Sequence, residues 1–122
     1  MKNLEEMSRD ERSLLTFFEC MVIDNWGRIQ TSKMNDDDYK IAEKWKEEKF
    51  IQFGRMPSKY ILGEGKKQHP AYPYINWVRL SDEAFELAYQ ERKNRALRNY
   101  HNLDEQLAEY GFSVNGRLEN EN

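Results

Sequence analysis

The residues best suited to chemistry in this sequence are basic and aromatic side chains, which alternate between positions 54 and 73. Cations can pair with phosphate and aromatic rings can stack on bases, so this mixture is typical of surfaces that contact nucleic acid. A second basic stretch spans residues 89 to 101. The candidate nucleic-acid-binding residues are Arg55, Lys59, Tyr60, Lys66, Lys67, His69, Arg92, Lys93, Arg95 and Arg98. The alternative interpretation is that both stretches are solvated surfaces that support solubility.

A separate set of candidate residues is acidic. Three consecutive aspartates, Asp36, Asp37 and Asp38, precede Glu43 and Glu47 within one expected helix. Carboxylates at the start of a helix interact favourably with its dipole. The same group could engage the basic surface of a protein partner.

Catalytic and metal-binding patterns are incomplete. The segment Gly63–Lys67 lacks the first glycine and the final hydroxyl residue of a phosphate-binding loop, and Asp36–Asp38 lack the glycine of a calcium loop. His69 and His101 lie in unrelated segments, without the spacing of metal ligands. Cys20 falls beside an apolar stripe, where a thiol acts as a small hydrophobic group. We therefore expect a protein that is not an enzyme and that uses no metal or cofactor.

The composition indicates one small folded domain. The chain has 122 residues and a net charge of −3, with 13% aromatic residues, which is more than disordered chains contain. No apolar run approaches the roughly 18 residues of a membrane-spanning helix. A single cysteine fits a reducing compartment. We expect a cytoplasmic protein that does not associate with membranes.

The expected elements begin with an N-terminal arm at 1–8 and a helix that starts at Arg9. Ser8 and Glu11 form the S-x-x-E capping box, and Gly27 supplies the left-handed residue that ends the helix. A short extended piece at 28–30, one helical turn near residue 31 and a helix over 36–49 follow.

The second half of the chain predicts a hairpin and further helices. Residues 50–53 and 74–80 favour paired strands, separated by a long loop from Pro57 to Pro73. Ser81 caps a long helix that ends near His101. A short accessory helix is expected at 102–112 and a flexible acidic tail at 113–122.

The order of these elements over residues 9 to 99 resembles a winged helix-turn-helix domain. The supporting segments are the apolar helix followed by Gly27-Arg28-Ile29, the run 42–51 that leads from a helix into a strand, and the junction 78–88. The chain also looks like small uncharacterised winged-helix proteins of phage and mobile elements. The resemblance implies an α+β fold, mostly α, with a two- or three-stranded antiparallel hairpin as the wing and an extended C-terminal helix. Its winged-helix domain would span 9–101.

The resemblance implies a DNA-associated regulator that binds duplex DNA. In this family the helix at 36–49 would enter the major groove, but three aspartates at its start disfavour contact with phosphate. We therefore expect the wing and the segment 92–98 to contact the DNA backbone. The alternative is a small inhibitor or adaptor whose acidic residues bind a basic protein partner. A homodimer is a further expectation, with Leu103, Leu107 and Tyr110 at its interface.

Overall fold

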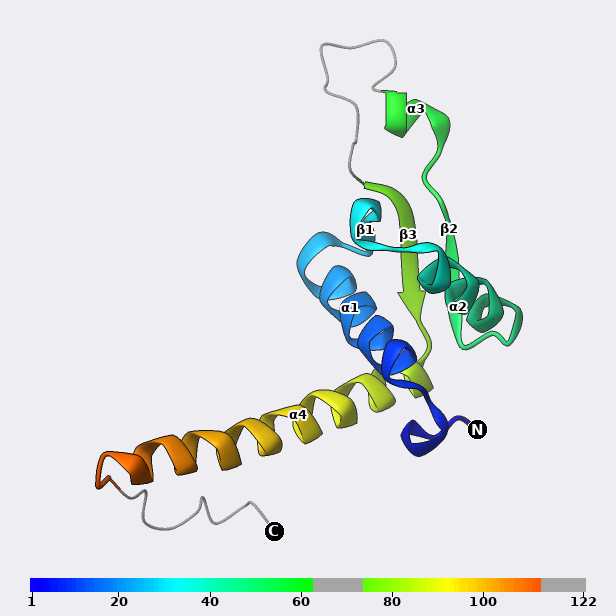
Figure 1. Cartoon of the computed structure of the whole chain (residues 1–122). Coiled ribbons are helices and arrows are strands. Elements are labelled where there is room, and N and C mark those ends of the chain that lie inside the picture. The colour runs from blue at the N-terminus through cyan, green and yellow to red at the C-terminus, as the bar shows by residue number, and fades with distance from the viewer. Residues whose placement is uncertain (63–73, 113–122) are drawn as a thin grey trace. The chain divides into compact units, whose positions relative to one another are not determined.

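The computed structural model describes residues 1–62 and 74–112 (Figure 1). The elements are η1 (Leu4–Glu6), α1 (Arg9–Asn25), β1 (Arg28–Gln30), η2 (Thr31–Lys33), α2 (Asp36–Glu47), β2 (Ile51–Arg55), α3 (Ser58–Leu62), β3 (Tyr74–Leu80) and α4 (Asp82–Glu109). The fold is α+β and mostly helical, with one three-stranded antiparallel sheet in the order β1-β3-β2, so the expected fold class is confirmed at this level. The chain divides into two compact units, Met1–Glu91 and Arg92–Asn122.

Both helices that lead into the sheet start at the predicted caps. At α1, the Ser8 hydroxyl accepts a hydrogen bond from the Glu11 amide at 3.1 Å, and the Glu11 carboxylate accepts one from the Ser8 amide at 3.0 Å. At α2, Asn35 and Asp38 make the same reciprocal pair at 2.8 and 3.1 Å. One aspartate of the acidic run therefore has a structural role, because it satisfies an amide that the helix leaves unpaired.

The end of α1 differs in one respect from the expectation. The first left-handed residue is Trp26, with φ of 59°, and Gly27 follows with φ of 83°. The Gly27 carbonyl accepts a hydrogen bond from the Val78 amide at 2.8 Å. A Cβ on Gly27 would lie 2.7 Å from the Val78 carbonyl oxygen. Glycine is thus required both by the backbone conformation and by the close approach of β3.

The predicted hairpin pairing is confirmed. Phe53 lies opposite Val78 and Gly54 opposite Trp77, while Arg28 of β1 lies opposite Trp77 on its other side. A Cβ on Gly54 would lie 2.8 Å from the Trp77 ring, so the indole lies against the bare backbone of β2. The strand at 74–80 is therefore the centre of the sheet and not an edge.

Buried Asn76 fixes the register of this central strand. Its side-chain oxygen accepts from the Tyr39 hydroxyl at 3.1 Å and lies 3.2 Å from the Thr31 hydroxyl, and its amide donates to the Gly54 carbonyl at 3.2 Å. The Thr31 hydroxyl also accepts from the backbone amide of Asn76 at 3.3 Å. A shift of β3 by one residue would turn Asn76 away from these partners and bury Trp77 instead.

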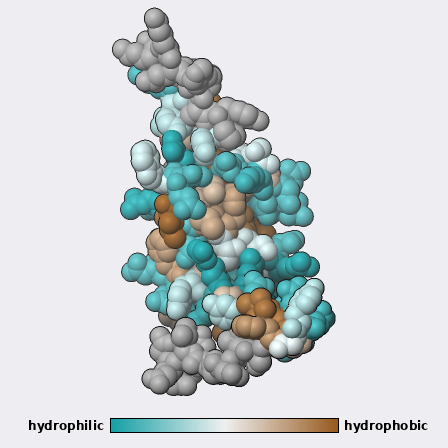
Figure 2. Space-filling view, turned by 90° about the vertical axis from the view of Figure 1, so that its left-hand side faces the viewer, coloured by the Kyte–Doolittle hydropathy of each residue, from teal (hydrophilic) through white to brown (hydrophobic). Residues whose placement is uncertain are grey.

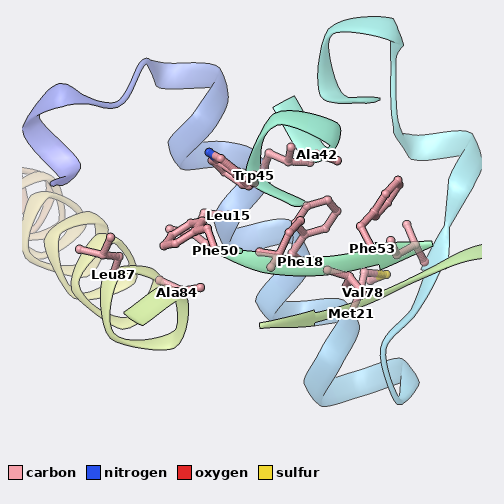
Figure 3. Close-up of a cluster of buried hydrophobic side chains, with 14 of the residues drawn as sticks. Leu15, Phe18, Met21, Ala42, Trp45, Phe50, Phe53, Val78, Ala84 and Leu87 are labelled. Atoms are coloured by element: carbon pink, nitrogen blue, oxygen red, sulfur yellow. The ribbon is translucent and has the colours of Figure 1, made fainter. Parts of the chain in front are cut away.

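The hydrophobic core lies between α1, α2, the start of α4 and one face of the sheet (Figure 3). Phe18 of α1 contacts Trp45 of α2 edge-on, with ring centroids 6.3 Å apart, and Phe53 of β2 at 6.1 Å. Leu87 is among the α4 residues that close this core. The core residues of α1 and α2 recur at three- and four-residue spacing, as expected for the buried face of an amphipathic helix.

Two element predictions were wrong. The expected break near residue 102 is absent, because α4 continues to Glu109. That stretch contains no glycine or proline, and a His101–Glu105 contact of 3.2 Å spans the predicted break. Residues 58–62 form α3 instead of loop, since the Pro57 carbonyl accepts from the Tyr60 and Ile61 amides at 3.0 and 3.1 Å. The rest of the predicted loop, 63–73, and the predicted tail, 113–122, lie outside the described residues.

Candidate nucleic-acid interface on the sheet

The sheet has a strongly basic composition. Its three strands, as the structure describes them, contain three arginines and no carboxylate. Ile29, Phe53 and Val78 point into the core, so the alternating positions form the opposite face. We call this opposite face the basic sheet face. Its residues are Arg28, Gln52, Gly54, Ile75, Trp77 and Arg79.

Arg28 is the centre of a cluster at the β1 side of the sheet. Its guanidinium carbon lies 5.1 Å from the ring centroid of Trp26 and 5.1 Å from that of Tyr74. The same guanidinium donates hydrogen bonds to the Tyr60 hydroxyl at 2.9 Å and to the Asn25 carbonyl at 3.1 Å. We call Trp26, Arg28, Tyr60 and Tyr74 the basic-aromatic cluster. It brings together the C-cap residue of α1 and residues of β1, α3 and β3.

Among the described residues, the cluster holds Arg28 in place through neutral partners only. A guanidinium has five N–H donors, and within the described residues two of them are used, both by neutral oxygen acceptors. The remaining donors and the full positive charge can therefore serve a ligand. Stacking on aromatic rings also restricts the side chain in advance, which lowers the entropy lost when an oxyanion binds.

Trp26 has an unusual conformation for its size. Its side chain is 86% exposed, yet its backbone adopts the left-handed region, which bulky residues rarely occupy. Such strain commonly costs about 1–3 kcal/mol and gathers at functional positions. An exposed indole held in this way next to Arg28 offers a flat apolar surface for a sugar or base.

Trp26→Asn should leave the fold as stable as before or stabilise it by about 1 kcal/mol, because asparagine tolerates the left-handed conformation. Urea unfolding followed by circular dichroism measures this change. A loss of more than about 1 kcal/mol would show that contacts of the indole outweigh its backbone strain.

An open groove of about 710 Å³ lies on the other side of Trp77, along β2. Its cations are Lys46 from the end of α2, Lys49 from the turn that follows, and Arg55 from the end of β2. The remaining lining residues are Ile51, Gln52, Phe53, Gly54 and Trp77, so the described part of the lining contains no carboxylate. The groove and the basic-aromatic cluster thus flank the same tryptophan with positive charge.

The structure brings together some of the residues that the sequence singled out. Arg55, Lys59 and Tyr60 lie close together in the chain on β2 and α3, and Tyr60 joins the basic-aromatic cluster. Arg92, Lys93, Arg95 and Arg98 lie on α4 in the second unit. Lys66, Lys67 and His69 lie outside the described residues.

Sequence reasoning missed Trp26, Arg28, Lys46, Lys49 and Trp77 as members of this surface. In the sequence, Trp26 marks only the end of a helix and Arg28 only the start of a short extended piece. An available signal was the absence of acidic residues from every predicted strand, together with the arginines in those strands. The pairing of β1 with β3, which joins positions almost fifty residues apart, was needed to group them.

The acidic candidates lie on α2. Asp36, Asp37, Glu43 and Glu47 are exposed, whereas Asp38 is half-buried in the capping box. Basic side chains interrupt this surface, and Lys44 lies 3.8 Å from Glu11 of α1. Of the candidate dimer residues, Leu103 and Leu107 lie on α4 and Tyr110 directly follows its last residue. Leu103 and Tyr110 are exposed and Leu107 is half-buried.

The described residues contain no metal-binding cluster and no membrane-spanning helix, and the comparisons with known proteins found no relative. Within residues 1–62 and 74–112, no three His, Cys, Asp or Glu side chains are grouped so that they could hold a metal ion. None of the described helices combines the length and apolar character needed to span a bilayer. Comparisons with protein-family models, with curated proteins and with solved structures found no match.

Proposed function

We propose that this protein is a non-catalytic DNA-binding module of the winged helix-turn-helix type, which contacts the phosphate backbone of duplex DNA. The observation that carries the proposal is a sheet with three arginines and no carboxylate, whose solvent face adjoins the basic-aromatic cluster. In this proposal the protein acts in the cytoplasm as a regulator.

The order of the elements supports this assignment. The chain forms helix α1, strand β1, the turn η2, helix α2 and then the β2–β3 pair. The family resemblance implies elements in this order. Arg55, Lys59 and Tyr60 occupy the first arm of the hairpin that would act as the wing. Wings of this kind lie along the DNA backbone, where positive charge contributes most of the affinity.

The charge of α2 determines which contacts are favourable. Asp36 and Asp37 are exposed at the start of the helix that would enter the major groove. A carboxylate about 4 Å from a phosphate oxygen costs on the order of kilocalories near a protein surface. Binding through the basic sheet face, the hairpin and the basic stretch of α4 avoids this cost, and it predicts affinity with little sequence discrimination.

The double variant Arg55→Ala/Lys59→Ala should weaken binding of a random duplex and reduce its salt dependence. Each phosphate contact that is lost lowers the slope of log K against log salt by about 0.9, so we expect a reduction of about two. Fluorescence anisotropy of a labelled duplex with the full chain, across about 50 to 200 mM salt, measures both quantities. Trp26→Asn should lower the affinity without changing this slope, because it removes no charge.

A matched control is Lys33→Ala/Lys40→Ala, which removes the same charge from exposed positions of η2 and α2. This control should retain the slope of the parent protein. If both double variants reduced the affinity and the salt slope equally, overall charge, and not the hairpin, would attract the duplex. Absence of binding at low salt would overturn the proposal.

The exposed carboxylates of α2 favour one alternative, a small inhibitor or adaptor that binds a basic protein. Asp36, Asp37, Glu43 and Glu47 are all exposed there. An arginine-rich peptide is a direct probe for this function. Under the alternative, it should bind the parent chain and lose affinity on Asp37→Asn/Glu47→Gln, while duplex DNA should not bind.

A further inference from the structure

The second unit contains a regular stripe of side chains along α4. Its members recur at alternating spacings of three and four residues: Lys93, Ala96, Tyr100, Leu103 and Leu107 on the helix, and Tyr110 directly after its last residue. This is the spacing at which one face of a helix meets a partner helix in a coiled coil. The stripe therefore describes a continuous seam over more than four helical turns.

Much of this seam is exposed. The exposed fractions are 54% for Tyr100, 46% for Leu103 and 87% for Tyr110. Leu97, next to the seam, is 49% exposed. Hydrophobic side chains gather in separate patches on the mostly hydrophilic face that Figure 2 shows. Exposed apolar residues that recur along one helix face, as in this seam, mark interaction sites more often than isolated ones do.

The charge along the same segment is divided into two halves. Residues 92–98 contain four cations, Arg92, Lys93, Arg95 and Arg98, and no acid. Residues 104–109 contain three acids, Asp104, Glu105 and Glu109, and no cation. A partner helix that complements this surface must carry acid beside the first half and base beside the second. A second copy of the same helix, running in the opposite direction, meets this requirement.

We propose that α4 forms an antiparallel two-helix homodimer through this seam. The two-fold axis lies between Tyr100 and Leu103, so that Tyr100 of one copy packs on Leu103 of the other. Ala96 then lies level with Leu107 of the second copy, and Lys93 with Tyr110. Each of these layers combines side chains of different size or character, as good interdigitation requires.

Electrostatics select the antiparallel arrangement over the parallel one. In the antiparallel dimer each basic half lies beside an acidic half of the second copy. A parallel dimer would place the four cations of one copy beside the same four of the other. The opposed helix dipoles add a smaller favourable contribution. The antiparallel alignment also agrees with the bounds of α4. It places Arg92 level with Gly111, which follows the end of the helix, so the pairing stops where the helix stops.

This dimer does not depend on DNA binding. Sedimentation equilibrium of the full chain over a range of concentrations should give a mass approaching twice the 14.7 kDa of one chain. Leu103→Glu should give a monomer at the same concentrations, because it places charge at the two-fold axis. The matched control Asn102→Glu adds the same charge on another face of the helix and should remain dimeric. Unchanged circular dichroism in both variants would show that folding is intact.

Disulfide cross-linking tests the direction of the helices. In a Cys20→Ala background, a mixture of Ala96→Cys and Leu107→Cys chains should form a mixed disulfide under mild oxidation, since the two positions face each other. Either variant alone should cross-link poorly. Efficient self-linking of Ala96→Cys would indicate parallel helices and overturn the proposal. A monomeric parent protein at every concentration, or a dimer that survives Leu103→Glu, would also overturn it.

Discussion

Trp45→Ala is expected to lower the free energy of unfolding by about 3–5 kcal/mol, the range found when a large buried aromatic is truncated. Trp45 has no solvent exposure and belongs to the cluster of buried side chains in the core (Figure 3). Its ring meets Phe18 at 6.3 Å and Phe50 at 5.3 Å between centroids, so both neighbours lose an edge-on contact. A domain of this size has about 5–15 kcal/mol of stability in total. Urea unfolding should therefore show a much lower midpoint.

Trp45→Phe separates the effect of volume from that of polarity. The indole N–H of Trp45 is buried and has no hydrogen-bond partner among the described residues. Phenylalanine leaves a smaller cavity than alanine and removes this unpaired donor, so it should cost clearly less. A Trp45→Ala variant as stable as the parent protein would mean that α2 does not pack on the core as the structure shows.

Gly27→Ala is the second substitution with a large expected effect, a loss of about 3 kcal/mol or more in the free energy of unfolding. The left-handed backbone at φ of 83° costs an alanine about 1–2 kcal/mol. The new Cβ would also meet the Val78 carbonyl oxygen at 2.7 Å, well inside contact distance. Relief of that overlap requires β3 to move away from Gly27, which weakens the bond from the Val78 amide.

Gly111→Ala is the matched control for this effect. Gly111 has a similar φ of 71°, but a Cβ there would meet nothing within 4 Å. Its substitution should therefore cost only the backbone term, about 1–2 kcal/mol at most. The difference between the two variants in urea unfolding measures the steric contribution of β3. Equal losses would show that the approach of Gly27 to Val78 is not important for stability.

The basic surface of the protein combines contributions from separate parts of the chain. Arg28, Tyr60 and Tyr74 come from three elements, and Trp77 joins the cluster to the groove lined by Arg55. A binding surface of this kind depends on the sheet register, because Arg28 and Trp77 share a face only when they are paired. The substitutions that test DNA binding leave the residues of that register in place.

Local sequence patterns determined where most elements begin. The capping pairs at Ser8 and Asn35 involve residues three positions apart, so their geometry follows from the helix itself. Apolar periodicity likewise predicted the buried faces of α1 and α2, and the alternation over 74–80 predicted β3. Prediction failed at Asn102, where a possible cap lies inside a helix, because a cap residue does not end a helix unless the following backbone also changes course.

The sequence by itself determined that the chain is a small α+β protein with two capped helices and a paired hairpin. Only the tertiary structure decided that β3 is central, that Trp26 is left-handed and that Arg28 lies beside Tyr60 and Tyr74. The physical reason is the range of the interactions involved. Caps and periodicity depend on neighbours within one or two helical turns, whereas the basic-aromatic cluster depends on strand pairing between residues that are distant in the sequence.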